Sequence, residues 1–299
     1  MADVIRLRPS SVLKHDECPA QYYFSAVEGL RSKVTSANLP FGTAVHEAMT
    51  GYILSKISGK PFNPVEAFEA EWDRAIENEI LGFSSIWDEP SMRATGKLLS
   101  ERFPEAWDRT GLTPVLDGDG PVVERRFQAT IAPGVVLTGQ PDVVAMNSDG
   151  EVIVVDVKTT ASAYDPTFVL VAEQLTAYQI LLEANRESLG IESVDKLGFI
   201  EAVKKKVPKT NRGTGPEVKE PLLAPSRDGA MTREYLSKVE DMARDIKRER
   251  FPRRPRMAFN SPCNMCDFRD YCLKGDMEGL YRPRDESPSS DDSSVSIAV

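Results

Sequence analysis

Apolar residues in the first third of the chain recur at every third or fourth position, which is the period of a helix. This pattern predicts helices over residues 10–27 and 42–58, and again over 64–109 with breaks near Gly82 and Pro90. Polar residues fill the positions between the apolar ones, as in helices that bury one face and expose the other. The N-terminal part of the chain is therefore expected to be helical.

After Pro121 the pattern changes to short runs rich in valine and isoleucine, which are typical of strands. The expected elements are, in chain order, strands over 122–131, 135–146 and 151–158, a helix over 169–185, a strand over 196–203, a loop over 208–228 and a helix over 231–250. This order predicts an α/β core with a helical insertion. The last residues, 285–299, are rich in serine and aspartate and lack basic residues, so we expect them to be disordered.

Two of the predicted strands form a hairpin around residues 148–150. The loop fits a type I turn followed by a glycine in the left-handed conformation. The register that follows from this turn places Asp142 opposite Asp156, with side chains about 4.5–5.5 Å apart at Cβ. Lys158 lies on the same face as Asp156, because alternate residues of a strand share a face. Two carboxylates and an ammonium group are thus expected to meet in one place.

This convergence has a chemical consequence. Two carboxylates at such a distance disfavour joint ionisation unless a cation lies between them. A divalent metal that prefers oxygen ligands, Mg²⁺ or Mn²⁺, would serve. Lys158 could then position an attacking water or balance charge on a phosphate. An ordinary charged surface hairpin is the alternative, but it fits poorly because Asp156 and Lys158 interrupt an otherwise apolar strand.

The composition is that of a soluble globular protein, with 41% hydrophobic and 28% charged residues in 299. No apolar run is long enough to span a membrane, and the N-terminal segment is too polar for a signal peptide. We therefore expect a cytoplasmic protein without membrane association. The net charge of −9 hides two basic clusters. They are the segment 244–256, with seven basic and two acidic residues, and the group Lys204, Lys205, Lys206, Lys209 and Arg212. Either cluster could contact a polyanion, or be a solvated face.

The four cysteines are unevenly placed. Cys18 stands alone near the N-terminus, whereas Cys263, Cys266 and Cys272 lie close together near the C-terminus. In a reducing compartment, such a set binds zinc or an iron–sulfur cluster, and the spacing alone does not choose between them. Such a site would join the two ends of the chain, and His15 is a less favoured substitute ligand.

Several of these segments together resemble a known family. Residues 139–142 (GQPD) and 156–158 (DVK) resemble the PD-(D/E)XK nuclease signature. The closer resemblance is to RecB-like nucleases, which include the nuclease domain of RecB, AddB-type subunits and CRISPR-associated RecB-like exonucleases. Residues 42–46 resemble the GxxxH motif of that branch, and residues 174–178 resemble its QxxxY motif. Cys18 with the late cysteines resembles its iron–sulfur site, so the resemblance spans residues 10–272.

The resemblance implies a restriction-endonuclease-like core, in which helices flank a mixed central sheet, with a helical insertion and a C-terminal cysteine segment. The expected division is a helical region with Cys18 and the GxxxH helix over 1–120, the nuclease core over 121–250, a cysteine segment over 251–284 that packs on the N-terminus, and the acidic tail over 285–299.

The resemblance also implies roles for individual residues. The metal ion, Mg²⁺ or Mn²⁺, would be held by His46, Asp142, Asp156 and the carbonyl of Val157. The catalytic residues would be Asp142, Asp156, Lys158, Gln174 and Tyr178. An acidic residue near Glu124 is frequent in the family. The cysteine site resembles a 4Fe–4S site more than a zinc site, with Cys18, Cys263, Cys266 and Cys272 as ligands.

The resulting hypothesis is a metal-dependent DNA exonuclease that hydrolyses phosphodiester bonds of single strands or DNA ends, in recombination, repair or phage DNA processing. The basic clusters would contact the DNA backbone without reading bases. Tyr22 and Tyr23 are expected to pack in the core rather than stack on bases. Two alternatives stay open: a CRISPR adaptation nuclease that trims spacer precursors, and a non-catalytic iron–sulfur or zinc protein that binds DNA. A protein partner in a recombination or CRISPR complex fits the nuclease hypotheses.

Overall fold

The computed structural model describes residues 4–208, 210, 213–254 and 261–283. The predicted disordered tail lies outside these residues, as do Lys209, Arg212 and Arg256 of the basic clusters. The chain divides into two compact units. The larger unit comprises Thr35–Phe127 and Gln140–Arg227, and the smaller comprises Met1–Val34, Gln128–Gly139 and Asp228–Val299. No helix among the described residues is long and apolar enough to cross a membrane.

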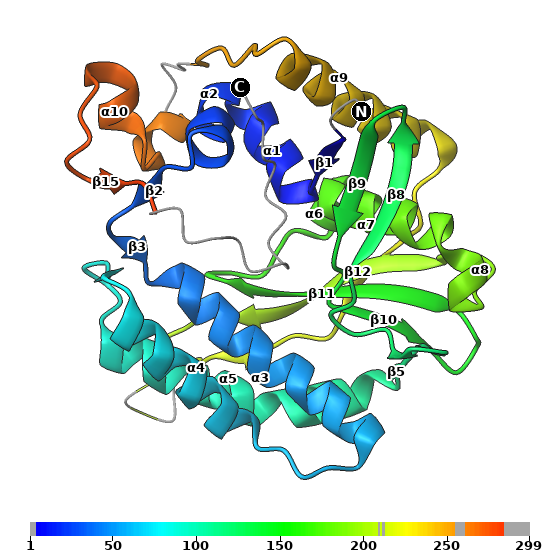
Figure 1. The fold of residues 1–299 in the computed structure, drawn as a ribbon. Helices are drawn as coiled ribbons and strands as arrows, with labels where there is room; N and C mark the ends of the chain where they lie inside the picture. The colour runs from blue at the N-terminus through cyan, green and yellow to red at the C-terminus, as the bar shows by residue number, and fades with distance from the viewer. Residues whose placement is uncertain (1–3, 209, 211–212, 255–260, 284–299) are drawn as a thin grey trace. The chain divides into compact units, whose positions relative to one another are not determined.

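The larger unit is built on a six-stranded mixed sheet (Figure 1). Its strands are, from one edge to the other, β13 (Glu217–Val218), β12 (Lys196–Val203), β11 (Val152–Thr160), β10 (Val143–Met146) and β5 (Thr113–Pro114), and β14 (Leu222–Pro225) also pairs with β12. β10 and β11 are antiparallel, whereas β11 and β12 are parallel. β11 and β12 are buried along almost their whole length, as expected for central strands with both faces covered.

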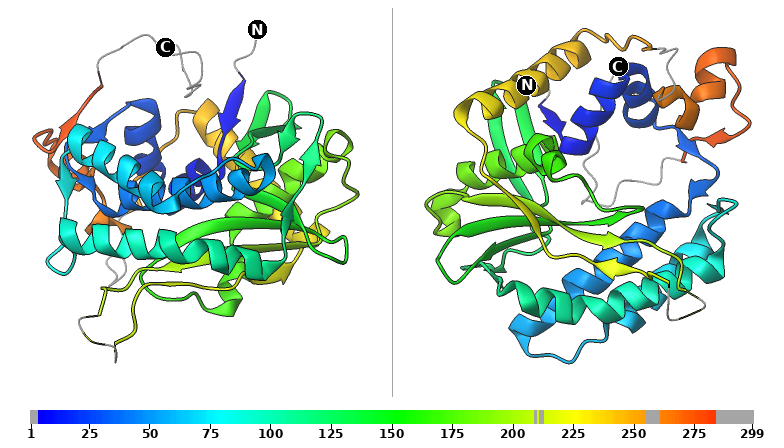
Figure 2. Two further views of the ribbon diagram at one scale, coloured as in Figure 1. Left: turned by 90° about the horizontal axis from the view of Figure 1, so that it is seen from below. Right: turned by 180° about the vertical axis from the view of Figure 1, so that it is seen from behind.

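Helices cover both faces of this sheet. One face carries α3 (Asn38–Ser58), α4 (Pro64–Asn78) and α5 (Glu89–Thr110), and the other carries α6 (Pro166–Val171) and α7 (Glu173–Ala184), followed by α8 (Arg186–Leu189) (Figures 1 and 2). Local sequence sets their ends. The Asn63 side chain accepts hydrogen bonds from the first turn of α4, and Asp88 does the same for α5. α3 ends at Gly59, which is left-handed (φ 66°).

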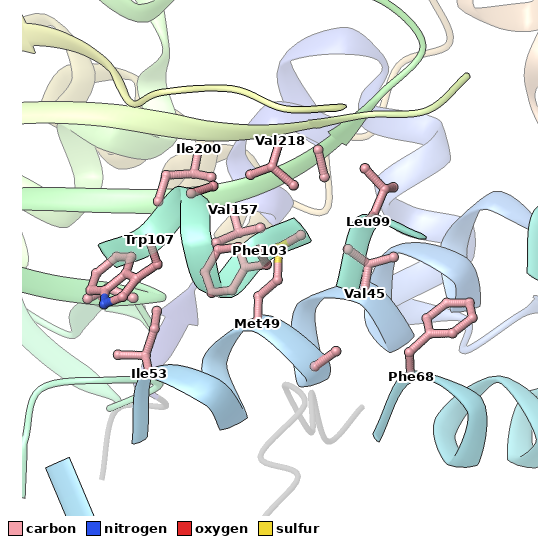
Figure 3. Packing of buried hydrophobic residues seen from close by; sticks show 14 of the residues in the cluster. Val45, Met49, Ile53, Phe68, Leu99, Phe103, Trp107, Val157, Ile200 and Val218 are labelled. Carbon is pink, nitrogen blue, oxygen red and sulfur yellow. The ribbon is translucent and has the colours of Figure 1, made fainter. Parts of the chain in front are cut away.

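The main core lies between the sheet and the first helical layer (Figure 3). Val157, Ile200 and Val218 of the sheet face apolar side chains of α3 and α5. The buried residues that the helices contribute include Val45, Met49, Ile53, Phe68, Leu99, Phe103 and Trp107. Since alternate residues of a strand face opposite ways, Asp156 and Lys158 face away from this core. The sheet thus has one largely apolar face and one face that carries the predicted chemistry.

The smaller unit contains a three-stranded sheet with the order β1 (Ile5–Leu7), β9 (Val135–Gly139) and β8 (Phe127–Ala132). Its helical elements are α1 (Pro9–Glu17), α2 (Pro19–Tyr22), a π-helix (Tyr23–Val27) and α9 (Gly229–Lys247). α9 contacts both α1 and β9. Tyr22 is 2% exposed and packs against Phe251, in agreement with the expected core role of this tyrosine.

The cysteine segment also belongs to the smaller unit. It contains a 3-10 helix (Pro262–Met265), α10 (Arg269–Lys274) and β15 (Leu280–Tyr281), and β15 pairs with β2 (Arg31–Ser32). Leu30, Phe268 and Leu280 form a small buried cluster, against which Phe24 and Cys266 pack. The segment therefore folds back on the N-terminal residues. Two further ladders, both in the larger unit, join β3 (Thr35–Ser36) to β4 (Leu81–Gly82) and β6 (Leu116–Asp117) to β7 (Gly120–Pro121).

Several predicted elements are interrupted. The helix predicted over 10–27 breaks at Cys18, which is extended because a residue before proline disfavours the helical conformation. The helix predicted over 169–185 is divided at Ala172, which is extended and begins α7. The run 135–146 contains two strands in different sheets, separated around Pro141.

The strand predicted over 122–131 is also interrupted. Its first residues bridge to Val143, the backbone turns left-handed at Glu124 (φ 53°), and β8 starts only at Phe127. The loop predicted over 208–228 contains β13 and β14, whose apolar residues complete the sheet edge beside β12. These short strands were hidden by the surrounding prolines and charges.

Candidate active site

The hairpin of β10 and β11 has the register that the turn chemistry predicts. Val143 pairs with Val155 and Met146 pairs with Val152. The turn closes with a left-handed Gly150 (φ 82°). Continued by one residue, this register sets Asp142 opposite Asp156. The Asp142 carboxylate then accepts a hydrogen bond from the Val157 N–H at 2.7 Å, which fixes it against β11.

Three potential metal ligands converge at Asp142. His46 Nε2, on α3, lies 2.9 Å from Asp142 Oδ2 and 2.8 Å from Glu124 Oε1. One donor atom from each residue lies within 4.8 Å of the others. Glu124 is held in place from both ends: its N–H donates to the Asp142 carbonyl at 2.9 Å, and its Oε2 accepts from Gln140 Nε2 at 2.6 Å. An imidazole and two carboxylates form a donor set that suits a divalent cation.

The electrostatics of this group are consistent with a cation site. Burial alone would lower the pKa of His46, but its hydrogen bonds to Asp142 and Glu124 raise that pKa to about 10. The imidazolium thus balances the two carboxylates when no other cation does. Its Nε2 carries one hydrogen, which cannot satisfy both acids fully. Glu124 Oε1 is buried, and apart from the shared His46 Nε2 at 2.8 Å it has no hydrogen-bond partner among the described residues. These residues therefore fit the divalent metal that the sequence predicts, which would displace the proton.

A second group surrounds Asp156, which is 1% exposed on β11. Lys158 Nζ lies 2.6 Å from Asp156 Oδ2, and Gln174 Nε2 donates to Asp156 Oδ1 at 3.0 Å. The same Gln174 amide donates to Tyr178 Oη at 2.7 Å, one turn further along α7. The acid therefore has a cation on one oxygen and an amide on the other.

Burial dominates the titration of this second group. It raises the pKa of Asp156, with a further increase from Asp142 and a partial compensation by Lys158. Burial opposes the charge of Lys158, but Asp156 more than offsets this effect and raises the pKa of the ammonium. Burial and Asp156 together raise the pKa of Tyr178, which is therefore a neutral hydroxyl near pH 7.

The structure thus brings the predicted residues together in two neighbouring groups. His46 and Asp142 lie with Glu124, whereas Asp156 lies with Lys158 and Gln174. The sequence pointed to Glu124 only through the resemblance, because the family often has an acidic residue near this position. Val157 contributes its N–H to Asp142, and its carbonyl stays a predicted metal ligand.

The lysine cluster that follows β12 is largely engaged within the larger unit. Lys204 Nζ lies 5.4 Å from the centre of the Phe41 ring and 5.5 Å from that of Trp87, as in cation–π contacts. Lys205 lies 3.5 Å from a carboxylate oxygen of Glu217. Two of the lysines expected to contact DNA therefore have partners within the protein.

The basic cluster of the smaller unit also makes internal ion pairs. Arg244 pairs with Asp241 on its own helix, and Arg250 lies 3.1 Å from Asp245. His15 is buried, and its Nε2 lies 3.8 Å from the other oxygen of Asp245. These partners reduce the positive charge that the segment 244–256 presents.

The four cysteines are all free thiols of intermediate exposure in the smaller unit. Burial raises the pKa of Cys266, and its interactions with Cys18 and Cys263 raise it further. Burial also raises the pKa of Cys272, which interacts with the same two thiols. Cys18 is therefore close enough to Cys266 and Cys272 to interact with them electrostatically, although among the described residues the four thiols do not form a group whose ligand atoms all lie within 4.8 Å of one another.

A comparison with models of protein families shows which family this chain belongs to. The model of the PD-(D/E)XK nuclease superfamily matches residues 6–273. The chain belongs to this superfamily. Membership confirms the expected restriction-endonuclease-like α/β fold and indicates a metal-dependent nuclease. No curated protein matches the chain. Among solved structures, the crystal structure of SSO0001 is similar at 14% identity over 90% of this chain and 85% of that one, with a TM-score of 0.38.

Proposed function

We propose that this PD-(D/E)XK protein is a Mg²⁺- or Mn²⁺-dependent deoxyribonuclease of the RecB-like branch, an exonuclease that acts on single strands or DNA ends in recombination, repair or phage DNA processing. The observation that carries the proposal is the meeting of His46, Glu124 and Asp142 beside the Asp156–Lys158 pair. Family membership supports the reaction class, and the proximity of these side chains supports the choice of site.

Each residue has a role in this proposal. His46, Glu124, Asp142 and Asp156 would hold the cation, with Val157 contributing its carbonyl. A bound divalent cation supplies water activation and neutralises charge on the phosphate. Lys158 holds a positive charge beside Asp156, where it orients the attacking water or stabilises the charged transition state. Gln174 fixes the second oxygen of Asp156, and Tyr178 in turn holds the Gln174 amide.

The direct test is cleavage of end-labelled DNA, single-stranded and duplex, with Mn²⁺. We expect wild type to release short products, and Lys158→Ala to be at least about 100-fold slower, as for the loss of a group that stabilises transition-state charge. Lys196→Ala is the matched control, because Lys196 is a partly exposed lysine on the adjacent strand whose ion pair is with Glu151, away from both acids of the site. Equal rates for Lys158→Ala and wild type would refute the role of Lys158. Absence of cleavage by wild type with either metal would refute the nuclease.

We also propose that Cys18, Cys263, Cys266 and Cys272 hold a 4Fe–4S cluster, with zinc as the competing occupant. Two observations support this: the cysteine segment pairs with and packs against residues near the N-terminus, and Cys18 interacts electrostatically with Cys266 and Cys272. Such a cluster would join these ends and act structurally. Anaerobically purified protein is expected to be brown, with broad visible absorbance and about four iron atoms per chain. A colourless protein with one zinc would refute the cluster.

A further inference from the structure

An aromatic group lies on the chemical face of the sheet, next to the candidate active site. Phe199 on β12 is the register partner of Asp156, so the backbones of these two residues are one strand spacing apart, about 4.8 Å, and their side chains lie on the same face of the sheet. Tyr164 and Phe168 pack on it, with ring centres 5.7 Å and 6.0 Å from that of Phe199. Their own ring centres are 4.5 Å apart at an interplanar angle of 30°. We call these three residues the aromatic platform.

The platform is held firmly against the strand of the catalytic lysine. Glu201, which is 4% exposed, is the register partner of Lys158 and accepts a hydrogen bond from the Tyr164 N–H at 2.6 Å. The Tyr164 side chain interacts electrostatically with Lys158, Glu201 and Asp156. Arg227, itself 5% exposed, donates a hydrogen bond to the Val169 carbonyl and so anchors α6. The rings therefore have a fixed place beside the reacting groups.

The outer side of the platform is apolar and reaches solvent. Phe168 is 43% exposed, and its neighbours on α6, Leu170 and Val171, are 45% and 66% exposed. Three large apolar side chains on a six-residue helix are more than packing requires. The Lys158 side chain is 31% exposed and interacts electrostatically with Tyr164, so its positive charge lies near the platform. The surface therefore combines a positive charge, which could face a phosphate, with an exposed apolar area next to it.

We propose that the aromatic platform stacks an unpaired nucleobase of the substrate, adjacent to the phosphodiester that is cut, with Phe168 as the contacting ring. This inference rests on the proposed nuclease function and narrows its substrate to a single strand or a frayed end. A nucleotide carries its base one sugar away from its phosphate, which matches an aromatic surface that starts one strand from Asp156. Stacking on an exposed ring tolerates every base but requires that the base be unpaired.

The test is the affinity for a fluorescein-labelled oligothymidylate, measured by anisotropy with a metal chelator so that no strand is cut. We expect Phe168→Ala to weaken binding by about five- to one-hundred-fold, the range for loss of one stacking ring. Phe168→Trp should bind as wild type does, which also shows that the site tolerates substitution. Leu54→Ala is the control, because Leu54 is an exposed leucine of α3, which covers the opposite face of the sheet, and its loss should change affinity by less than about twofold.

A second substrate separates stacking from an indirect effect on the fold. Oligonucleotides that carry abasic positions should bind wild type as weakly as Phe168→Ala binds the intact strand, and the two losses should not add. An equal loss for Phe168→Ala and Leu54→Ala, or additive losses, would overturn the inference. So would a change of oligomeric state in Phe168→Ala, which would mean that a second copy covers the platform. If Phe168→Ala cuts and binds like wild type, the platform fails alone. If wild type neither binds nor cuts DNA, the nuclease proposal fails with it.

Discussion

Gln174 offers a sharp test of how Asp156 is positioned. Its amide donates to Asp156 at 3.0 Å and to Tyr178 at 2.7 Å, and Asp156 is 1% exposed, so water cannot easily replace the lost donor. A hydrogen bond to a charged group contributes about 1.5–3 kcal/mol. If the bond orients Asp156 in the transition state, Gln174→Leu should lower kcat by about 10- to 100-fold. Tyr178→Phe removes only the acceptor that holds the amide, so its effect should be smaller.

The chain provides a matched control on the same helix. Gln179 is 3% exposed, accepts from the Arg227 N–H at 2.7 Å and donates to the Arg227 carbonyl at 3.1 Å, but it touches neither acid of the site. Gln179→Leu should therefore lower the free energy of unfolding by about 1–3 kcal/mol and leave kcat within about twofold. The two variants carry the same substitution, but Gln174→Leu is expected to lower activity, whereas Gln179→Leu is expected to lower stability and leave activity nearly unchanged.

The assay is single-turnover cleavage of labelled DNA under saturating Mn²⁺, with urea denaturation of each variant in parallel. Single-turnover conditions separate the chemical step from product release. Equal loss of kcat in Gln174→Leu and Gln179→Leu would show that both act through stability. Full activity of Gln174→Leu would refute a positioning role for this amide.

Three further predictions concern the metal group, the core and the thiols. Glu124→Gln should raise the Mn²⁺ concentration for half-maximal cleavage by about tenfold or more, and an unchanged metal titration would remove this residue from the ligand set. Gly96→Ala should lower the free energy of unfolding, measured in urea, by about 1–3 kcal/mol, because the new Cβ would lie 2.0 Å from the fully buried Phe68 ring. Gly51→Ala is the control and should cost less, because its Cβ would meet the exposed Phe62 ring, which can move away. Cys18→Ser should lose the visible absorbance expected of an iron–sulfur cluster while the Mn²⁺ titration of any remaining activity stays unchanged, and full absorbance would exclude this thiol as a ligand.

Local chemistry made part of the site predictable. The turn at 148–150 sets the register of β10 against β11, and strand alternation then places Asp142, Asp156 and Lys158 without knowledge of the rest of the fold. Helical spacing likewise puts Gln174 and Tyr178 one turn apart, and their hydrogen bond follows from it. Each of these relationships involves residues close together on one element or on one hairpin.

The remaining contacts depend on packing between distant segments. The apolar face of α3 is buried against the sheet and α5, and this packing brings His46 to Asp142. The helical periodicity of the sequence shows that α3 has an apolar face, but it does not show which elements that face packs against. The division of the run 135–146 into strands of two separate sheets was equally hidden, since both halves have the same strand-like composition. The aromatic platform depends on the parallel pairing of β11 with β12, which connects Phe199 to Asp156 across a long crossover.

Glu124 shows most clearly why the sequence undervalued one member of the site. In a regular strand over 122–131, alternation would fix the face on which this side chain lies. The backbone instead leaves the strand at this residue (φ 53°), a conformation that costs a non-glycine residue about 1–2 kcal/mol. The N–H bond to the Asp142 carbonyl and the Gln140 bond to its carboxylate offset that cost. A strained residue that is held by two such bonds, with its acidic group aimed at His46, is best explained by a function for the carboxylate, because an ordinary strand residue would satisfy the sheet with less strain.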